Sequence, residues 1–314
     1  NPLYWNDKET VINSATFLAI ENPSTDVARY RAGDLDMTNY GLPPEQFAKL
    51  QKELPGEVYI TRTLATYSYE LNNKKAPFDN VNVRKALNLS LDRNVITDKV
   101  LGQGQTPTYV FTPTYIEEGH LIQQPAYSKE PMAQRNEEAI KLLEEAGYSK
   151  ANPLKFTILY NTNENHKKVA IAAASMWKAN TKGLIDVKLE NQEWKTYIDS
   201  RRAGRYDAAR AGWNADYNQA TTFGNYFLSN SSNNTAKYAN PEYDKAIAES
   251  YVATDAEGRA KAYAKAEEIL AKDFGIVPIF NYVNPRLVKP YVKGYSGKDP
   301  QDHIYLRNLY IIKH

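Results

Sequence analysis

The chain has 314 residues, of which 39 are Lys or Arg and 37 are Asp or Glu, so its formal net charge is only +2. This balance favours neither nucleic acid nor an anionic membrane surface as a partner. The longest apolar runs are far shorter than the roughly 20 residues that a membrane-spanning helix needs. The length indicates two lobes, because a single hydrophobic core stops growing at about 250–300 residues.

Cysteine is absent. This excludes disulfides, thiol catalysis and cysteine metal sites, and it is compatible with folding outside the cytoplasm. Tyrosine is abundant, with 24 residues against 9 Phe, which is typical of hydrated binding surfaces because each ring carries a polar hydroxyl. The chain starts at Asn1-Pro2 with neither Met nor signal peptide, so we expect a mature or truncated product.

The first part of the chain predicts a small α/β unit. Helices are expected over 22–32, ending at Gly33, and from Pro44 to Leu50. Strands are expected over 9–20, 34–38 and 57–63.

From residue 66 onward, strands alternate with helices. Strands are expected over 66–72, 154–160, 186–189, 208–212 and 276–282. Helices are expected over 81–99, 135–146, 167–179, 241–251 and 256–272. The alternation predicts a doubly wound α/β lobe. Beyond Pro285 the chain is rich in Tyr, Gly and Pro and closes with a last apolar run over 304–312.

The segment Arg210-Ala-Gly-Trp-Asn-Ala-Asp-Tyr-Asn218 places a cation, two aromatic rings and a carboxylate around an Ala-Gly-Trp backbone. It follows a predicted strand, and in α/β lobes the loops at strand ends are where ligands bind. An Arg–Asp ion pair on a solvated loop is the structural alternative. The glycine and the two aromatic residues favour a site for a zwitterion.

Catalytic motifs are scarce. The four His, at 120, 166, 303 and 314, form no HExxH pattern, so no metal site is predicted. Gly102-Gln-Gly104 lacks the third glycine of a dinucleotide loop, and neither a phosphate loop nor a GxSxG elbow occurs. Paired carboxylates of the glycosidase kind stay open, because spacing alone does not exclude them. No catalytic residue and no cofactor are predicted.

The block Ala76-Pro-Phe-Asp-Asn-Val-Asn-Val-Arg-Lys-Ala-Leu-Asn-Leu-Ser-Leu-Asp-Arg-Asn-Val-Ile96 resembles the PF-x-D-x-x-V-R-x-A-L…D-R-x-x-I motif of the peptide/nickel family of extracytoplasmic solute-binding proteins. Further stretches resemble its oligopeptide-binding members and their murein-tripeptide-binding relatives: 160–168, 191–197, 210–218, 228–232 and 286–290. The resemblance covers the whole chain. It covers only the C-terminal part of a family member, which carries a further N-terminal segment.

The resemblance implies an α/β, periplasmic-binding-protein-like fold of type II, with two lobes that close on a ligand. Residues 65–283 would form one lobe, nearly complete and carrying most of the peptide site. Residues 1–64 and 284–314 would belong to the other lobe, shared with the missing N-terminal segment.

The resemblance also implies a set of ligand contacts: Tyr40, His166, Trp194, Arg201, Arg210, Gly212, Trp213, Asn214 and Asp216. Asp216 matches the carboxylate that takes the peptide's α-ammonium. The backbone of 211–214 would pair with the peptide as an added strand, and Gly212 would let that strand approach closely.

The other matching positions surround that strand. Arg210, Arg201 and His166 match cations near which the carboxylates of peptides of different lengths end. Trp194 and Trp213 match walls of side-chain pockets, and the loop with Tyr40 matches a contact from the opposite lobe. The structural alternatives are core packing for the tryptophans, a helix end for Arg201, and a helix-start residue for His166.

The function implied is that of an ABC-importer receptor in the periplasm, which captures peptides of about two to five residues by their backbone and termini. Its partners would be such peptides, an inner-membrane permease and the missing N-terminal part, with no nucleic acid. A murein-tripeptide-binding protein for cell-wall peptide recycling is the nearest alternative. A periplasmic hydrolase and a chaperone-like protein are more distant ones.

Overall fold

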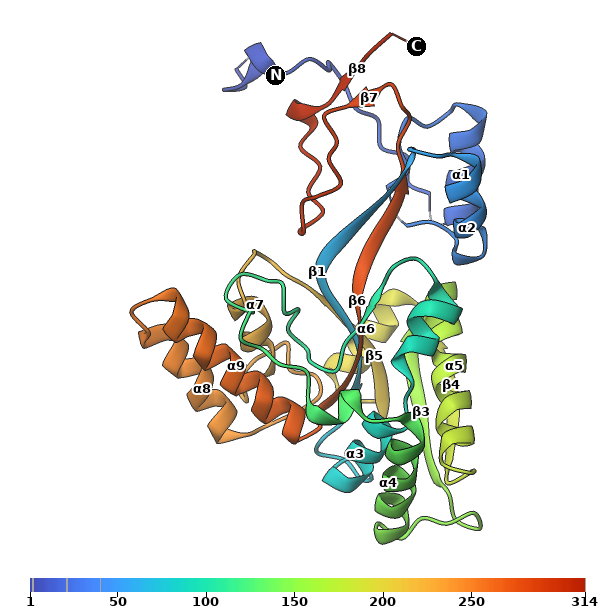
Figure 1. Cartoon of the computed structure of the whole chain (residues 1–314), viewed down its shortest axis with the longest axis vertical. Coiled ribbons are helices and arrows are strands. Elements are labelled where there is room, and N and C mark those ends of the chain that lie inside the picture. Colours follow the sequence, from blue (N-terminus) through green and yellow to red (C-terminus); the bar gives the residue numbers. More distant parts are fainter. Residues whose placement is uncertain (2, 21, 40, 314) are drawn as a thin grey trace. The chain divides into compact units, whose positions relative to one another are not determined.

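The structure, a computed structural model, describes residues 1, 3–20, 22–39 and 41–313 (Figure 1). The chain forms two compact units. Unit 1 contains Asn1–Thr63, Gly102–Gln105 and Tyr282–His314, and unit 2 contains Leu64–Leu101 and Thr106–Asn281. The sequence-based borders are 64/65 and 283/284, whereas the units of the structure divide at 63/64 and 281/282, and residues 102–105 also belong to unit 1. The assignment of these units to the two lobes of a binding protein stays a prediction.

Two helices form the core of unit 1, and both were expected. Helix α1 is Pro23–Ala32, begins with the Asn22 side chain accepting from the Ser24 amide, and ends at Gly33 with a left-handed φ of 88°. Helix α2 is Pro44–Glu53. Their buried faces pack around Tyr30, Phe47 and Leu50, together with Leu287.

Two expected strands of unit 1 are absent from the described residues. Glu9 ends the short 3-10 helix η1 (Asp7–Glu9), residues 10–20 follow in irregular conformation, and Val11 and Phe17 are exposed. Residues 34–38 contribute a single bridge, from Met37 to Val288. Alternation in the sequence was misleading here, because a strand also needs a partner for its backbone groups. The short pair β7 (Val292–Lys293) and β8 (Tyr310–Ile311) lies in the C-terminal segment, which also holds η5 (Leu306–Asn308).

A six-stranded sheet has the order β2-β6-β1-β5-β3-β4. Its strands are β1 Val58–Leu71, β2 Thr106–Pro107, β3 Leu154–Asn161, β4 Ile185–Gln192, β5 Ala208–Asn214 and β6 Ile276–Leu287. The predicted strands 57–63 and 66–72 are one continuous strand, β1. Strand β3 runs parallel to β4 and β5, whereas β1 is antiparallel to β5. The sheet is therefore mixed.

Helices cover both faces of the sheet in unit 2. They are α3 Val81–Leu89, α4 Met132–Glu145, α5 Glu164–Asn180, α6 Trp194–Arg202, α7 Thr221–Gly224, α8 Pro241–Val252 and α9 Ala256–Lys272. Short turns of helix occur at η2 Val95–Leu101, η3 Ala126–Lys129 and η4 Asn225–Phe227. In Figure 1, α8 and α9 lie on the left of the sheet in unit 2 and α4 and α5 on the right.

The predicted helix over 81–99 is wrong as a single element, because α3 ends at Leu89 and a π-helical segment begins at Val95. Asp92 caps this second segment by accepting from the amides of Asn94 and Val95. Arg93 is buried and donates to the carbonyl oxygens of Pro278 and Asn88. A helical hydrophobic spacing did not reveal this break, since the cause is a polar side chain that turns inward.

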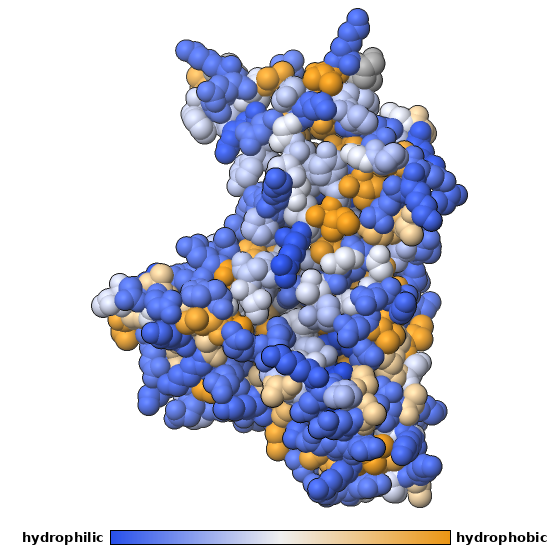
Figure 2. Space-filling model, in the orientation of Figure 1, coloured by the Kyte–Doolittle hydropathy of each residue, from blue (hydrophilic) through white to orange (hydrophobic). Residues whose placement is uncertain are grey.

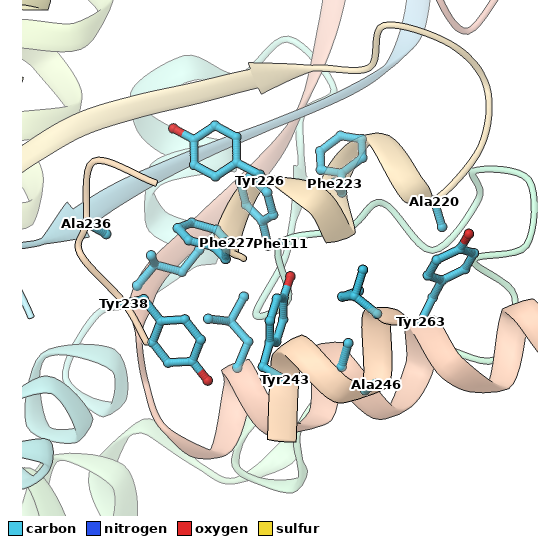
Figure 3. Close-up of a cluster of buried hydrophobic side chains, with 14 of the residues drawn as sticks. Phe111, Ala220, Phe223, Tyr226, Phe227, Ala236, Tyr238, Tyr243, Ala246 and Tyr263 are labelled. Carbon is cyan, nitrogen blue, oxygen red and sulfur yellow. The ribbon is translucent and has the colours of Figure 1, made fainter. Parts of the chain in front are cut away.

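The two faces of the sheet have separate cores. On one face, Tyr69 of β1 and Phe156 of β3 pack against Trp177 of α5, with ring centroids 5.9 Å and 5.7 Å apart. On the other, aromatic residues of the 220–238 segment pack against α8 and α9 around Phe111 and Tyr243 (Figure 3). None of the helices in the described part of the chain is long and apolar enough to cross a membrane.

Candidate functional site

Strand β5 carries the segment that the sequence singles out. Its register with β1 pairs Gly212 with Tyr67 and Arg210 with Tyr69. Two hydrogen bonds flank this pairing: the Ala215 amide donates to the Leu64 carbonyl at 2.8 Å, and the Asn72 amide donates to the Asp207 carbonyl at 3.0 Å. They show which residues of β5 are hydrogen-bonded to β1. In an antiparallel pair, alternate residues direct their backbone groups to the partner. The odd-numbered residues of β5 therefore face β1, and the even-numbered ones face the opposite edge.

Among the described residues, a strand pairs with that opposite edge only at the start of β5. Strand β3 matches Ala208 and Ala209 and ends at Asn161, after which the chain turns into α5. The hydroxyl of Tyr197 donates to the Arg210 carbonyl. Beyond it, the backbone N–H and C=O groups of Gly212 and Asn214 have no strand partner among the described residues. Such an edge can accept an extended polypeptide as a further strand.

Asp216 lies two residues beyond this edge and is exposed. Thr222 orients it, because the threonine hydroxyl donates to Asp216 Oδ2 at 3.3 Å and accepts from the Asp216 amide at 3.2 Å. Thr222 also fixes Trp213, whose Nε1 donates to its carbonyl oxygen at 2.9 Å. An oriented carboxylate beside an open strand end is suited to a cationic group. Sequence reasoning missed Thr222, since nothing in its spacing signals the contact.

Arg210 lies on the face of the sheet that carries Tyr67 and Tyr69, with its guanidinium carbon 5.2 Å from the Tyr67 ring centre. His166 of α5 contacts the same ring, at 5.6 Å between centroids. Burial, together with the positive charge of Arg210, lowers the pKa of His166 to about 2. The structure thus brings Arg210 and His166 together, but His166 is neutral here rather than the cation that the sequence predicts.

Arg201 does not join them. It lies on the opposite face of the sheet, where its Nη2 contacts Glu70 Oε2 at 2.9 Å and Thr235 Oγ1 at 3.0 Å. Glu70 is 1% exposed and also accepts from Tyr226 at 2.6 Å. Burial lowers the pKa of Arg201, but the charge of Glu70, the neighbouring rings of Tyr197 and Tyr226 and the hydrogen bond to Glu70 together raise it by more, so this pKa lies well above its ordinary value. In this structure the predicted carboxylate-binding cation is therefore half of a buried ion pair.

The two tryptophans differ in exposure. Trp194, the first residue of α6, is 55% exposed and stacks on Tyr197, with centroids 5.9 Å apart. Because Tyr197 binds the Arg210 carbonyl, Trp194 lies close to the open edge of β5. Trp213 is half-buried and packs edge-on against Tyr226 at 4.8 Å. Tyr40, the remaining predicted contact, lies outside the described residues.

Within the described residues, no group of three or more His, Asp or Glu side chains could hold a metal ion. The site in unit 2 is accordingly built from a strand edge, one oriented carboxylate, one arginine and aromatic rings. These groups recognise backbone and charge and include no nucleophile paired with a base, so the arrangement is suited to binding.

The fold and this site define the class of protein. Residues 1–235 match the family described as bacterial extracellular solute-binding proteins, family 5 Middle, and the chain belongs to this family. The resemblance stated from the sequence is thereby confirmed, as is the prediction of a binding protein rather than an enzyme.

The particular relatives are oligopeptide-binding proteins. The chain is 97% identical over 314 residues to the periplasmic oligopeptide-binding protein OppA of Haemophilus influenzae, covering 100% of this chain and 58% of the relative. A crystal structure of Haemophilus influenzae OppA in complex with RPPGFSPFR matches with a TM-score of 0.93 at 96% identity, over 99% of this chain and 61% of that one.

A second solved structure, the Escherichia coli murein tripeptide binding protein MppA, matches with a TM-score of 0.91 at 43% identity, over 99% of this chain and 60% of that one. The chain thus spans about three-fifths of the length of the relatives that it matches. These matches confirm the predicted α/β fold, and the names of the relatives confirm the predicted periplasmic location.

Proposed function

We propose that this chain carries most of the peptide site of an ABC-importer receptor that captures oligopeptides. The observation that supports this best is the open edge at Gly212 and Asn214, followed by the oriented carboxylate of Asp216. A peptide added to this edge would be held through its main chain, which is the same for every sequence. Affinity would therefore depend little on side-chain identity.

The termini of the peptide would supply its charges. Asp216 would bind the α-ammonium, forming a charge-assisted hydrogen bond that is stronger than a neutral one. Arg210 would attract the carboxylate of peptides whose C-terminus reaches its face of the sheet. His166, neutral before binding, would donate a hydrogen bond to that carboxylate. Arg201 would act indirectly, since Glu70 already neutralises it.

The side chains of the peptide would meet aromatic walls. Trp194 offers a half-exposed ring beside the open edge, and Trp213 closes the other face. Space left between these rings and a small side chain would hold water, which bridges polar groups at little cost. Tolerance of many sequences would follow from such hydrated pockets.

The receptor as a whole would include the part of the relatives that this chain does not match, and would deliver peptides to an inner-membrane permease. Unit 1 exposes large apolar side chains, with Leu3 at 89%, Trp5 at 78% and Phe17 at 72%; hydrophobic residues are visible among the hydrophilic surface in Figure 2. Burial of such residues is favourable, which supports a role for that surface in holding the further segment.

Peptide length is a property of the whole site. The solved Haemophilus influenzae relative was crystallised with RPPGFSPFR, a peptide of nine residues. We propose that this chain also serves peptides longer than the range of about two to five residues that the sequence suggests, because pairing through the main chain sets no upper length.

Murein tripeptide is the second candidate ligand, since the matching murein-binding structure shares the fold at 43% identity. Identity of 97% to an oligopeptide-binding relative favours the first candidate. Both ligands would present a free amine to Asp216, so that residue does not separate them.

The test replaces Asp216 by Ala in the 314-residue chain and, in parallel, at the matching position of full-length Haemophilus influenzae OppA. Calorimetry with a tripeptide is expected to show an affinity loss of about tenfold or more, because a charge-assisted bond disappears. The affinity for the N-acetylated tripeptide should change little. Glu144→Ala, which removes an exposed carboxylate from α4, is the control. Equal losses for both peptides would remove Asp216 from this role.

A further inference from the structure

We propose that Glu118 positions Asp216 for its ligand, through a clamp formed by Glu118, Arg259 and Gln219. Glu118 touches no ligand group itself. This inference rests on the proposed role of Asp216 and adds a residue on which that role depends. Neither the sequence pattern nor the family match singles out Glu118.

The clamp is centred on a buried carboxylate. Glu118 is 7% exposed, and its Oε1 accepts from Arg259 Nε at 2.8 Å and from Arg259 Nη2 at 2.6 Å. Its Oε2 accepts from Gln219 Nε2 at 2.9 Å. Arg259 is on α9, a helix fixed by the core of unit 2, so the carboxylate ties Gln219 to a rigid element.

Backbone contacts of the neighbouring residue fix the same loop. The Ala220 amide donates to the Glu117 carbonyl at 3.0 Å, and the Glu117 amide donates to Asn218 Oδ1 at 3.2 Å. The segments 117–118 and 218–220 are therefore joined at three successive residues of the loop that follows Asp216.

The other end of Gln219 continues this network to Asp216. Its Oε1 accepts from Thr221 Oγ1 at 2.6 Å, and Thr221 Oγ1 lies 2.7 Å from the hydroxyl of Tyr263 on α9. Figure 3 shows the Tyr263 hydroxyl directed toward the segment that carries Ala220. The next residue, Thr222, is the one that orients the Asp216 carboxylate.

The backbone conformation of Glu118 independently indicates that its position is held by its surroundings. Its φ is 65°, in the left-handed region that residues other than Gly seldom occupy. Such a conformation persists only where the surroundings hold it in place, and the bonds to Arg259 and Gln219 do so here. Gly would fit this backbone more easily, but it would lack the carboxylate.

The physical consequence is preorganisation. Asp216 is exposed and lies in a loop, where an untethered carboxylate would lose conformational freedom when it binds a cation. The Glu118 clamp removes that freedom beforehand. Weakening the clamp should therefore reduce the preference for a free amine while the strand edge at Gly212 and Asn214 continues to hold the peptide.

The experiment measures the ratio of affinities for a free-amine tripeptide and its N-acetylated form, in the 314-residue chain and in full-length Haemophilus influenzae OppA. Glu118→Gln places an amide against the amide of Gln219, so two donors face each other. The ratio is expected to fall about threefold to tenfold. Glu257→Gln removes an exposed carboxylate of α9 that contacts His120, and should leave the ratio unchanged.

A double variant, E118Q with Q219E, tests the geometry directly. The amide introduced at position 118 would still accept from Arg259 through its oxygen and would donate to the carboxylate introduced at position 219. The second oxygen of that carboxylate would accept from Thr221, so the exchange keeps every bond of the clamp. We expect it to restore the ratio. If E118Q folds poorly, Arg259→Lys weakens the clamp from the exposed side and should lower the ratio in the same direction.

The outcomes separate the two claims. If the wild type prefers the free amine and E118Q shows the same preference, the role of Glu118 is overturned and that of Asp216 is not. Equal weakening of both peptides together with a lower melting temperature would show a merely structural role and would also overturn it. A wild-type protein with no preference for the free amine would overturn the proposed role of Asp216, and with it this inference.

Discussion

Arg201 and Arg210 show how one sheet gives the same residue type two different environments. Both were predicted as cations for a peptide carboxylate. Arg210 extends from β5 over the ring of Tyr67, on the face that also carries His166. Arg201 extends from α6 on the other face and pairs with the buried carboxylate of Glu70.

The difference shows that the face of the sheet on which a charged side chain lies decides whether the charge is accessible or already paired. Side chains alternate across a sheet, so the residues of β5 on either side of Arg210 belong to the face of Glu70 and Arg201. On that face the positive charge is neutralised and serves stability. On the other face, burial and the positive charge of Arg210 lower the pKa of His166 and keep it unprotonated.

The largest expected effect tests Arg201 as a stabilising residue. Arg201→Ala leaves the carboxylate of Glu70 buried without its counter-charge, which should lower the free energy of unfolding by about 3–5 kcal/mol. Urea denaturation of both proteins measures the change. Arg202→Ala, at the exposed neighbouring position on α6, should shift stability by no more than about 0.5 kcal/mol. Similar midpoints for the two variants would refute the contrast drawn between the arginines.

A smaller effect, on binding rather than on folding, is expected at Arg210. Arg210→Gln should lower the affinity for peptides with a free C-terminal carboxylate by about tenfold, since one charge-assisted contact is lost. This loss is expected only for peptides of the length at which the C-terminus reaches this face. C-terminally amidated peptides serve as the control and should lose little. Calorimetry with a series of peptides of increasing length measures the pattern. A uniform loss across lengths and termini would assign Arg210 to packing instead.

A third effect is a pH dependence of stability that arises on the Arg210 face. The unfolded chain takes up a proton at His166 near pH 6.5, whereas the folded chain does so only at about 2. The stability due to neutral His166 is therefore complete above pH 6.5 and is lost as the pH falls toward 2. One such proton gives a slope of at most about 1.4 kcal/mol per pH unit.

Replacing His166 by Gln should remove this slope. Urea midpoints of the wild type and of His166→Gln are compared between pH 7 and pH 5, with the range from pH 7 to pH 8 as the internal control, where the two curves should run parallel. Parallel curves below pH 6.5 as well would mean that His166 takes up its proton in the folded protein near its ordinary pKa.

Much of the fold follows from local sequence. Asn22 and Gly33 mark the ends of α1, and the hydrophobic spacing of α4, α5, α8 and α9 gave their positions to within a few residues. Capping and amphipathic periodicity are local properties, so a chain records them directly. The strand expected over 9–20 failed because strand formation depends on a partner elsewhere in the chain.

The site was predictable in its composition but not in its layout. The residue types of the segment from Arg210 to Asn218 predicted a site for a zwitterion, and the family resemblance added recognition of a peptide backbone. Only the tertiary structure showed that β3 ends before it reaches the level of Gly212 on β5 and that Glu70 forms an ion pair with Arg201. It also showed the hydrogen bonds of Thr222 and Glu118 to the loop of Asp216. Apart from the short-range contact of Thr222 with Asp216, these facts depend on strand register and on contacts between residues more than a hundred positions apart in sequence, such as Glu118 with Gln219 and with Arg259. No local pattern encodes such contacts, because they arise only when the chain packs.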